Sequence, residues 1–464
     1  MSLLLGIDTG TSAVKVCIFD ATGRMLGRGY RAYHTEHPAP GWAEIPVENW
    51  WEGFLEGLAE AAAGAGVKPR DVAAIGLSTL CAALVPLDAE LNPLRPAIIF
   101  MDQRSCRQAE LMREKFGEEA FSVTGNSIMP GTCSGTSMLW IMQEEPEIYR
   151  RTRYFAHGNT YMGAKLTGNV GIDPTNASYT GLFDTCNAWD WSPELARRLD
   201  IPLDLLPRVV PSTSPVGHIT EDVARVTGFL PGTPVAMGGA DTACSALAIG
   251  VVEARQVFES CGTSDVITIC LDRPHFDRRF LNRCHVVPNR WLSHGPMSTP
   301  GAAVRWLRDQ AFGAEYQLAQ FTGQSIYDIM TEEAMTSPPG SRGLIFLPYM
   351  SGERAPIWDP KARGVFFGLS LATTRGDLVR AVFEGTAYGL RQIMEIAEER
   401  LGERVQEIVA VGGCSRNRFW NQIKADVLGK PITPLKFEET AVLGAAMLGG
   451  IAGGVYRDHY DAIR

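Results

Sequence analysis

The chain has 464 residues, with 43 Lys and Arg against 52 Asp and Glu, and 45% of its residues are hydrophobic. This length predicts two or three domains, and the apolar share indicates large buried cores rather than a disordered or fibrous protein. The net charge of −9, without any block of Lys and Arg, argues against nucleic acid and against an anionic membrane as partners. A small molecule is therefore the expected ligand.

The predicted elements begin with a hairpin. Residues 3–7 and 14–19 are two short apolar strands joined by a polar turn that contains glycine. Strands and helices alternate after it, which is typical of an α/β protein. The later predictions are a helix at 50–63, buried strands at 72–77 and 97–100, helices at 106–116 and 137–144, a strand at 235–237, and an Ala-rich helix that begins at Asp241.

The same pattern returns in the second half of the chain. A strand at 257–261, a Gly-Thr-Ser turn and a strand at 266–270 repeat the first hairpin and its Gly-Thr-Ser turn. This repeat predicts a duplicated architecture of two domains, residues 1–247 and 248–464, whose turns face each other across a cleft. The apolar segment 441–455 is shorter than the roughly 20 residues that span a bilayer, and we expect a buried helix there.

Neither a signal peptide nor a zinc site is indicated. The first ten residues have no basic region before a long apolar run, and the ten cysteines show neither CxxC nor Cys/His zinc spacing. The cysteines are expected to be small core residues of a reduced cytosolic protein.

The first Gly-Thr-Ser turn has the chemistry of a phosphate site. Gly10 lets backbone N–H groups approach a ligand, and the hydroxyls of Thr11 and Ser12 can donate to anionic oxygens. Asp8 would repel phosphate unless a cation such as Mg²⁺ lies between them, which favours a nucleotide ligand. The alternative is an ordinary hairpin turn rich in Asp, Thr and Gly.

A Gly-Gly turn follows a further apolar strand at 408–411. Gly412 and Gly413 precede a helix, an arrangement that leaves room for a nucleotide near the helix N-terminus but also suits a plain strand-to-helix connection. Neither GxGxxG nor GxxxxGK[ST] occurs, which disfavours a Rossmann dinucleotide site and a P-loop.

Carboxylates at strand ends are candidates for the acceptor side of the site. Asp241 could accept the proton of an attacking hydroxyl, or it could merely cap its helix. Asp102 and Arg104 follow a strand and could bond sugar hydroxyls, or they could form an exposed ion pair at a helix start.

Over its whole length the chain resembles the FGGY family of carbohydrate kinases. Residues 6–12, 262–264 and 412–417 are similar to its two phosphate motifs and its adenosine motif, and residues 364–384 match its C-terminal signature. The resemblance implies a two-domain actin-like, ribonuclease-H-like ATPase fold, with Asp241 as catalytic base and Asp8 near Mg²⁺. It assigns ATP contacts to Gly10, Thr11, Ser12, Gly262, Thr263, Ser264, Gly301, Gly413, Cys414 and Asn417.

The sugar segments depart from the family pattern. Leu80 and Cys81 lie where xylulose kinases have a Gln-Met-His-Gly stretch, Phe100 replaces a usual Trp, and Ser137 replaces a Lys. The positions that correspond to sugar contacts are Leu80, Cys81, Phe100, Asp102, Arg104 and Asp241.

The resulting prediction is ATP-dependent phosphorylation of a hydroxyl of a small sugar, with a pentulose such as xylulose as the expected acceptor. The alternatives are another ketose, a polyol or a sugar acid, a non-catalytic sugar and nucleotide sensor, a chaperone-type ATPase and a phosphoanhydride hydrolase. A homodimer is expected only on the general ground that dimers are the commonest assembly.

Overall fold

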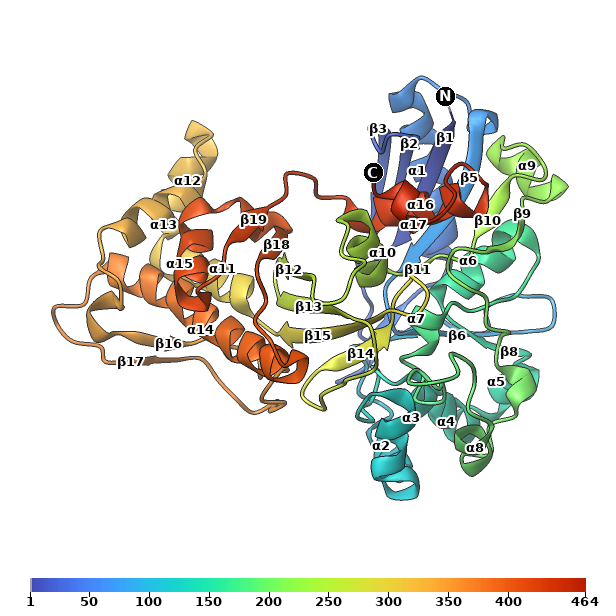
Figure 1. Cartoon of the computed structure of the whole chain (residues 1–464), viewed down its shortest axis with the longest axis horizontal. Helices are drawn as coiled ribbons and strands as arrows, with labels where there is room; N and C mark the ends of the chain where they lie inside the picture. Colours follow the sequence, from blue (N-terminus) through green and yellow to red (C-terminus); the bar gives the residue numbers. More distant parts are fainter. Residues whose placement is uncertain (1) are drawn as a thin grey trace.

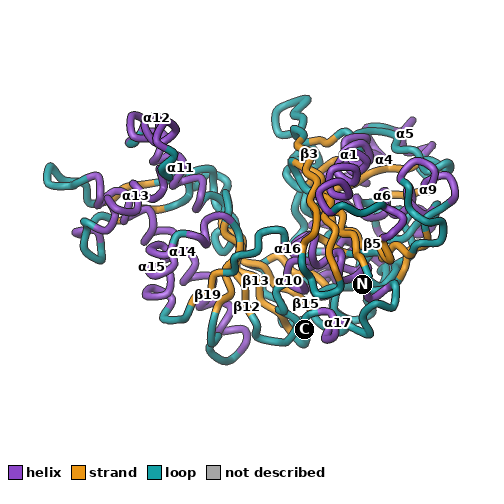
Figure 2. Tube along the Cα trace, turned by 90° about the horizontal axis from the view of Figure 1, so that it is seen from above, coloured by secondary structure: helices purple, strands orange, loops and turns teal. Residues whose placement is uncertain are grey.

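The structure is a computed structural model that describes residues 2–464. It has two lobes, each built around a mixed β-sheet, and the second sheet lies in the middle of the molecule (Figure 1). Figure 2 shows the same lobes from above, with helices around the strands of each. The predicted α/β architecture of two domains is confirmed.

The first sheet carries the predicted hairpin near its centre. Its strand order is β3-β2-β1-β5-β10-β9, and β11 also pairs with β5. Strand β1 runs antiparallel to β2 and parallel to β5, so that Asp8 lies between Lys15 on one side and Ser78 on the other. The strands are β1 (Leu3–Thr9), β2 (Ala13–Asp20), β3 (Met25–Ala32), β5 (Val72–Thr79), β9 (Pro215–His218), β10 (Pro234–Ala236) and β11 (Gly239–Ala240).

A smaller sheet and a group of helices complete the first lobe. The smaller sheet has the order β4-β7-β6-β8, and α1 packs against β2 and β3 of the main sheet. The smaller sheet consists of β4 (Glu44–Ile45), β6 (Ala83–Leu87), β7 (Ala97–Ile99) and β8 (Tyr154–Ala156). The α-helices are α1 (Glu48–Ala65), α2 (Cys106–Phe116), α3 (Glu118–Thr124), α4 (Ser134–Glu144), α5 (Pro146–Arg151), α6 (Gly158–Thr167), α7 (Pro174–Ala177), α8 (Pro193–Arg198), α9 (Glu221–Thr227) and α10 (Asp241–Ala248), and the 3₁₀ turns are Pro69–Asp71 and Leu203–Leu205.

The second sheet repeats the order of five strands of the first, and the two sheets differ in the edge on which the sixth strand lies. Its order is β14-β15-β13-β12-β18-β19, and β12 runs antiparallel to β13 and parallel to β18, as β1 does with β2 and β5. Each Gly-Thr-Ser turn therefore follows the equivalent strand of its own sheet. The strands are β12 (Val257–Cys261), β13 (Asp265–Leu271), β14 (Leu281–Cys284), β15 (Trp291–Met297), β18 (Ile408–Val411) and β19 (Ile432–Pro434).

Helices surround the outer part of the second lobe. The long helix α14 begins with a capping box in which Thr374 and Asp377 bond reciprocally to each other's backbone N–H. A separate hairpin, β16 (Ile345–Leu347) and β17 (Val365–Phe367), packs beside this helix. The helices are α11 (Pro300–Ala311), α12 (Gly313–Thr322), α13 (Ile326–Met335), α14 (Arg375–Leu401), α15 (Arg418–Leu428), α16 (Thr440–Ala452) and α17 (His459–Ala462), with 3₁₀ turns at Ser341–Gly343 and Gly413–Arg416.

The chain returns to the first lobe at its end. Helix α16 packs on β1 and β5 of the first sheet rather than on the second sheet. A Cβ atom at Gly6 or Gly76 would collide with the α16 backbone, at Val442 and Ala445 respectively, so glycine is needed for this close approach. Residues 440–452 thus pack on the first lobe although they follow the predicted division at residue 247, which stays a prediction.

Two further predictions concern burial. The expected buried helix at 441–455 is confirmed by α16, and within residues 2–464 no helix is long and apolar enough to cross a membrane. All ten cysteines are free, and most are buried or half-buried as expected, although Cys106 is exposed.

Candidate active site

Hydrogen bonds hold the backbone of the first Gly-Thr-Ser turn, and the side chains of the turn are partly exposed. Gly10 N–H donates to the carbonyl of Ala13 at 2.9 Å, and the Tyr33 hydroxyl donates to the carbonyl of Gly10. Thr11 is half-buried and Ser12 is exposed. The backbone carbonyls of the turn have hydrogen-bond partners of their own, so they do not need the hydroxyls of Thr11 and Ser12. These two hydroxyls remain available to an anion.

Asp8 is a buried carboxylate with few partners. It is 5% exposed, and one of its oxygens accepts a hydrogen bond from Ser78 Oγ at 2.7 Å. Burial raises the pKa of Asp8 to about 6, Lys15 opposes that shift, and the negative charge of Asp241 adds to it. A buried acid next to a second acid is suited to a hard divalent cation, so these residues fit Mg²⁺.

Asp241 is the first residue of α10, directly after β11. Its carboxylate accepts bonds from Thr242, at 2.6 Å from the backbone N–H and 3.0 Å from the hydroxyl. The N-cap position of α10 is Ala240, and Asp241 is the acid of the first turn, where its carboxylate accepts a backbone N–H. The role of Asp241 as a base and its role at the helix start therefore both stay predictions. The side chain is half-buried and therefore reachable by a substrate.

Polar residues that the sequence analysis missed hold the segment before Asp241. Thr175 Oγ1 accepts the Ala240 N–H at 2.7 Å while donating to the buried Asp173, and Asn159 Nδ2 donates to the carbonyl of Gly239 at 3.1 Å. The Asp-Pro-Thr pattern at 173–175 is a recognisable helix start. Nothing local in that pattern shows that the threonine reaches a segment 65 residues away.

Three of the predicted nucleotide segments meet in the second lobe. A Cβ atom at Gly301 would collide with the carbonyl of Gly262, and Cys414 Sγ lies 3.3 Å from that same carbonyl oxygen. Gly412 has φ +95°, and a Cβ there would collide with the backbone of Cys261. The glycines are required for this packing, and it leaves Gly262, Thr263 and Gly413 exposed for a ligand.

Other nucleotide candidates have structural partners. Asn417 caps α15 by accepting the Trp420 N–H at 3.0 Å and donates to Thr331 Oγ1 at 2.8 Å. Thr263 Oγ1 accepts a bond from Arg305 at 2.7 Å, which places a cation beside the second turn. Ser264 is half-buried.

The sugar candidates fall into two groups. Leu80 and Cys81 follow β5 beside the first turn, where Leu80 N–H donates to the carbonyl of Thr9 at 2.9 Å. Burial raises the pKa of the Cys81 thiol to about 12, Arg283 opposes that shift, and Asp241 adds to it, so the thiol lies near both charges. Phe100 is half-buried and packs against the core of the first lobe.

Asp102 and Arg104 form a buried ion pair, which corrects the alternative of an exposed one. Asp102 is fully buried and accepts bonds from Arg104 and from the Ala43 N–H at 2.6 Å. Arg104, with a side chain only 1% exposed, also pairs with Glu44 and stacks on Trp42. Because these partners already use both side chains, a contact of either with sugar stays a prediction.

The sequence analysis also missed Arg283, on β14. This residue is 4% exposed and its guanidinium lies 4.0 Å from the centre of the Tyr179 ring. Its Nε and Nη1 atoms have no hydrogen-bond partner within residues 2–464. The strand around it shows no motif, since only the packing of β14 on the first lobe brings it near Cys81 and Asp241.

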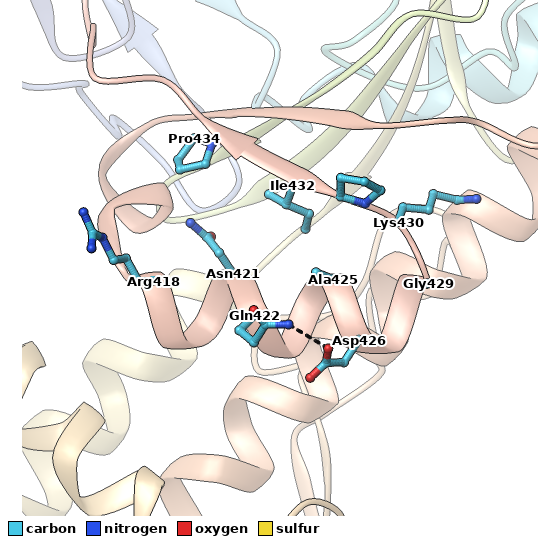
Figure 3. A pocket seen from close by; sticks show the side chains of 10 residues that line it. Arg418, Asn421, Gln422, Ala425, Asp426, Gly429, Lys430, Ile432 and Pro434 are labelled. Carbon is cyan, nitrogen blue, oxygen red and sulfur yellow. Dashed lines mark hydrogen bonds between the residues drawn. The ribbon is translucent and has the colours of Figure 1, made fainter.

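A pocket of about 620 Å³ lies elsewhere, between α15 and β19 (Figure 3). Gln422 and Asp426 bond to each other on its helical wall at 2.8 Å, and Arg418 and Lys430 stand at its two ends. None of the predicted site residues lines it. The candidate active site is therefore the region around Asp8, Asp241 and the two turns.

Comparisons with known proteins identify the family of the chain. Residues 3–248 match the model of the N-terminal domain, and residues 257–453 that of the C-terminal domain, of the FGGY family of carbohydrate kinases. The chain is 32% identical to a xylulose kinase of Staphylococcus xylosus over 97% of this chain and 90% of that protein. It is 30% identical to a gluconokinase of Bacillus subtilis over 100% of this chain and 90% of that protein. The crystal structure of xylulose kinase from Rhodospirillum rubrum superposes with a TM-score of 0.89 at 29% identity, covering 99% of this chain and 92% of that one.

Proposed function

We propose a specific mechanism for this chain, which belongs to the FGGY family of carbohydrate kinases and is a sugar phosphotransferase that uses ATP. In this mechanism Asp241 is the general base and Asp8 is the carboxylate beside Mg²⁺. The observation that carries the proposal is the placement of these two acids at strand ends, close enough for the charge of Asp241 to raise the pKa of Asp8.

Asp241 acts on the acceptor. Its carboxylate takes the proton of the sugar hydroxyl as that oxygen forms a bond to the γ-phosphorus of ATP and the bond to ADP breaks, a contribution of about 10² to 10⁴ in rate. The bonds from Thr242 orient the carboxylate, and Thr175 holds the backbone just before it. A fixed base of this kind removes much of the entropic part of the barrier.

The two turns receive the nucleotide. Thr11 and Ser12 donate to phosphate oxygens from the first lobe, and the exposed backbone N–H of Thr263 does so from the second, where the Gly262 N–H is already bonded to the carbonyl of Ser264. When bound beside Asp8, Mg²⁺ would neutralise phosphate charge. Cys414 and Asn417 lie beyond the second turn, where the adenosine would bind.

The acceptor is a small sugar, and a pentulose such as xylulose remains the candidate that the sequence suggested. Relatives named xylulose kinase and gluconokinase match over nearly the whole chain at similar identity, so similarity does not separate these two acceptors. A sugar and nucleotide sensor without turnover is less well supported, because a base is present at Asp241.

A coupled assay of ADP release tests the proposal. Ketoses, aldoses, polyols and sugar acids are supplied one at a time with ATP and Mg²⁺, and at least one of them should raise ADP release well above the sugar-free rate. If none does so, the kinase mechanism fails, and a high sugar-free rate would instead support hydrolysis.

A further inference from the structure

Side chains, rather than a second strand, bond the backbone that leads into Asp241. Within residues 2–464 the short strand β11 pairs with a single strand, β5. Thr175 Oγ1 accepts the Ala240 N–H at 2.7 Å, and Asn159 Nδ2 donates to the Gly239 carbonyl at 3.1 Å. These two side chains therefore satisfy backbone groups that a neighbouring strand would otherwise bond.

Asp173 holds both of these side chains. Its Oδ1 accepts the Thr175 hydroxyl, and its Oδ2 accepts Asn159 Nδ2 at 3.2 Å. The same carboxylate accepts the backbone N–H of Thr175 and that of Asn176, each at 3.0 Å, and Asn176 Nδ2 at 2.7 Å. All five donated bonds end on one carboxylate, so Asp173 accepts them all only when it is ionised.

The cluster around Asp173 is sealed from water. Asp173 and Thr175 are fully buried, and Asn159 is 1% exposed. Hydrogen bonds to an ionised group are stronger than those between neutral groups, and burial removes the competition of water for them. Because a buried charge that loses a donor costs free energy, each of the three side chains keeps the others in one arrangement. A rigid set of side chains therefore fixes the backbone of β11.

The placement of β11 decides where the Asp241 carboxylate lies. Within residues 2–464 this carboxylate bonds only to the adjacent Thr242, so no contact from another element fixes it. Its position therefore depends on the backbone that leads into α10. A displacement of about 1 Å at a reacting group can cost about 10²-fold in rate, which is enough for the support of β11 to govern how well a base works.

We propose that Asp173, Thr175 and Asn159 are positioning residues for the base, because they set the backbone of β11 and, through it, the orientation of Asp241. This inference rests on the proposed function and names what holds the base of the same site. None of the three side chains touches the reacting atoms, and the charge of Asp173 orders the other two. Loss of this support lowers kcat and leaves the KM for ATP and for sugar nearly unchanged, since the contacts of both substrates remain.

A merely structural role is the competing explanation. In that case substitutions in the cluster would lower the free energy of unfolding, but each folded molecule would keep its kcat. The two roles differ in the kcat of the folded enzyme and in its coupling to Asp241.

The first experiment removes the hydroxyl that accepts the Ala240 N–H, and activity is measured with the acceptor that raises ADP release most. Thr175→Val keeps the size of the side chain, and we expect the kcat of the folded enzyme to fall about tenfold or more, with both KM values nearly unchanged. Thr175→Ser keeps a hydroxyl and should recover most of the kcat. Asn159→Leu removes the bond to Gly239 instead, should behave like Thr175→Val, and replaces it if that variant does not fold. A loss seen only in KM would overturn the inference.

Thr167→Val is the matched control, at the other end of α6 from Asn159. The Thr167 hydroxyl also accepts a backbone N–H, from Asn169 at 3.2 Å, and donates one bond, to the carbonyl of Gly163 at 2.8 Å. This variant loses as many bonds as Thr175→Val, so both should lower the free energy of unfolding, but its kcat should stay within about twofold of the unaltered enzyme. Equal falls in kcat for the two variants would assign the cluster a structural role and overturn the inference.

The second experiment repeats Thr175→Val in the Asp241→Asn enzyme. If Thr175 acts through the base, its substitution should lower the residual kcat by less than about twofold there, because no base remains to be positioned. A fall by the same factor with and without Asp241 would overturn the inference while leaving the base in place. Full activity of Asp241→Asn alone would overturn the proposed base and this inference with it.

Discussion

The two Gly-Thr-Ser turns follow equivalent strands of two sheets that share the order of five strands, but their surroundings differ. The first turn lies beside the carboxylates Asp8 and Asp241. The second lies against Gly301 and Arg305, and the acids below it, Glu259 and Asp265, are paired with Lys424.

The two surroundings favour different roles, because the first turn is flanked by acids and the second by glycines that permit close packing of the backbone. In the first lobe the two acids have no ion-pair partner within residues 2–464, which supports the proposed roles toward a proton and a cation. In the second lobe, Lys424 neutralises the two acids. The glycines there allow the backbone to come close to a ligand. The two turns are thus alike in their strand topology, and the residues around them differ, which is why we propose a different role for each.

The comparison of the two turns predicts that a change at Asp241 has the largest effect on activity. Asp241→Asn keeps the shape but removes the base, so kcat should fall by about 10² to 10⁴ while ATP binding stays nearly unchanged. Steady-state assays and calorimetric titration with an ATP analogue measure the two quantities. Substantial surviving activity would remove Asp241 from the role of base.

Loss of the cation between the two buried acids of the second lobe should have a large effect on stability. The Lys424 ammonium is fully buried between Glu259 and Asp265 and contacts Cys261 Sγ at 3.3 Å. Lys424→Met leaves two buried acids without a cation and should lower the free energy of unfolding by about 3 kcal/mol.

Denaturant unfolding measures this loss, and the exposed pair of Arg391 with Glu395 provides the control. Arg391→Met should cost less than about 1 kcal/mol, because exposed ion pairs contribute little. Equal losses of unfolding free energy in the two variants would show that the buried Lys424 stabilises the fold no more than an exposed ion pair does.

The shape of the second turn is tested at Gly301. Gly301→Ala forces the carbonyl of Gly262 to move, so the KM for ATP should rise by about tenfold, equivalent to roughly 1.4 kcal/mol, with the KM for sugar unchanged. Gly313→Ala is the matched control, because a Cβ at that helical glycine meets no neighbour. A rise in the KM for sugar alone would contradict the assignment of Gly301 to the nucleotide side.

The smallest predicted effect is a pH dependence at the first turn. Because burial raises the pKa of Asp8 to about 6, its carboxyl is neutral below that pH and charged above it. The Mg²⁺ concentration needed for half-maximal activity should therefore rise about tenfold per pH unit as the pH falls below 6. Equal Mg²⁺ requirements at acidic and neutral pH would separate Asp8 from the metal.

The sequence predicted the elements whose signals are local. The hairpin strands, the two turns, the start of α10 and the glycines at Gly301 and Gly412 could all be read from short patterns. Helix α14 was not predicted, although its capping box is a local signal, and its interior Gly385 is explained only by its close approach to the backbone of Phe346.

The tertiary structure decided what depends on distant segments. The return of α16 to the first sheet, the burial of Asp102 with Arg104, and the support of Ala240 by Thr175 have no local signature. Arg283 is the clearest case, since a lone arginine on a short strand is unremarkable until packing removes its water and leaves it without a partner. The sequence by itself determined the family and the two Gly-Thr-Ser turns, because those need particular residues in a row. The surroundings of Arg283 were decided by the fold, because the residues that contact it and its neighbours come from both lobes.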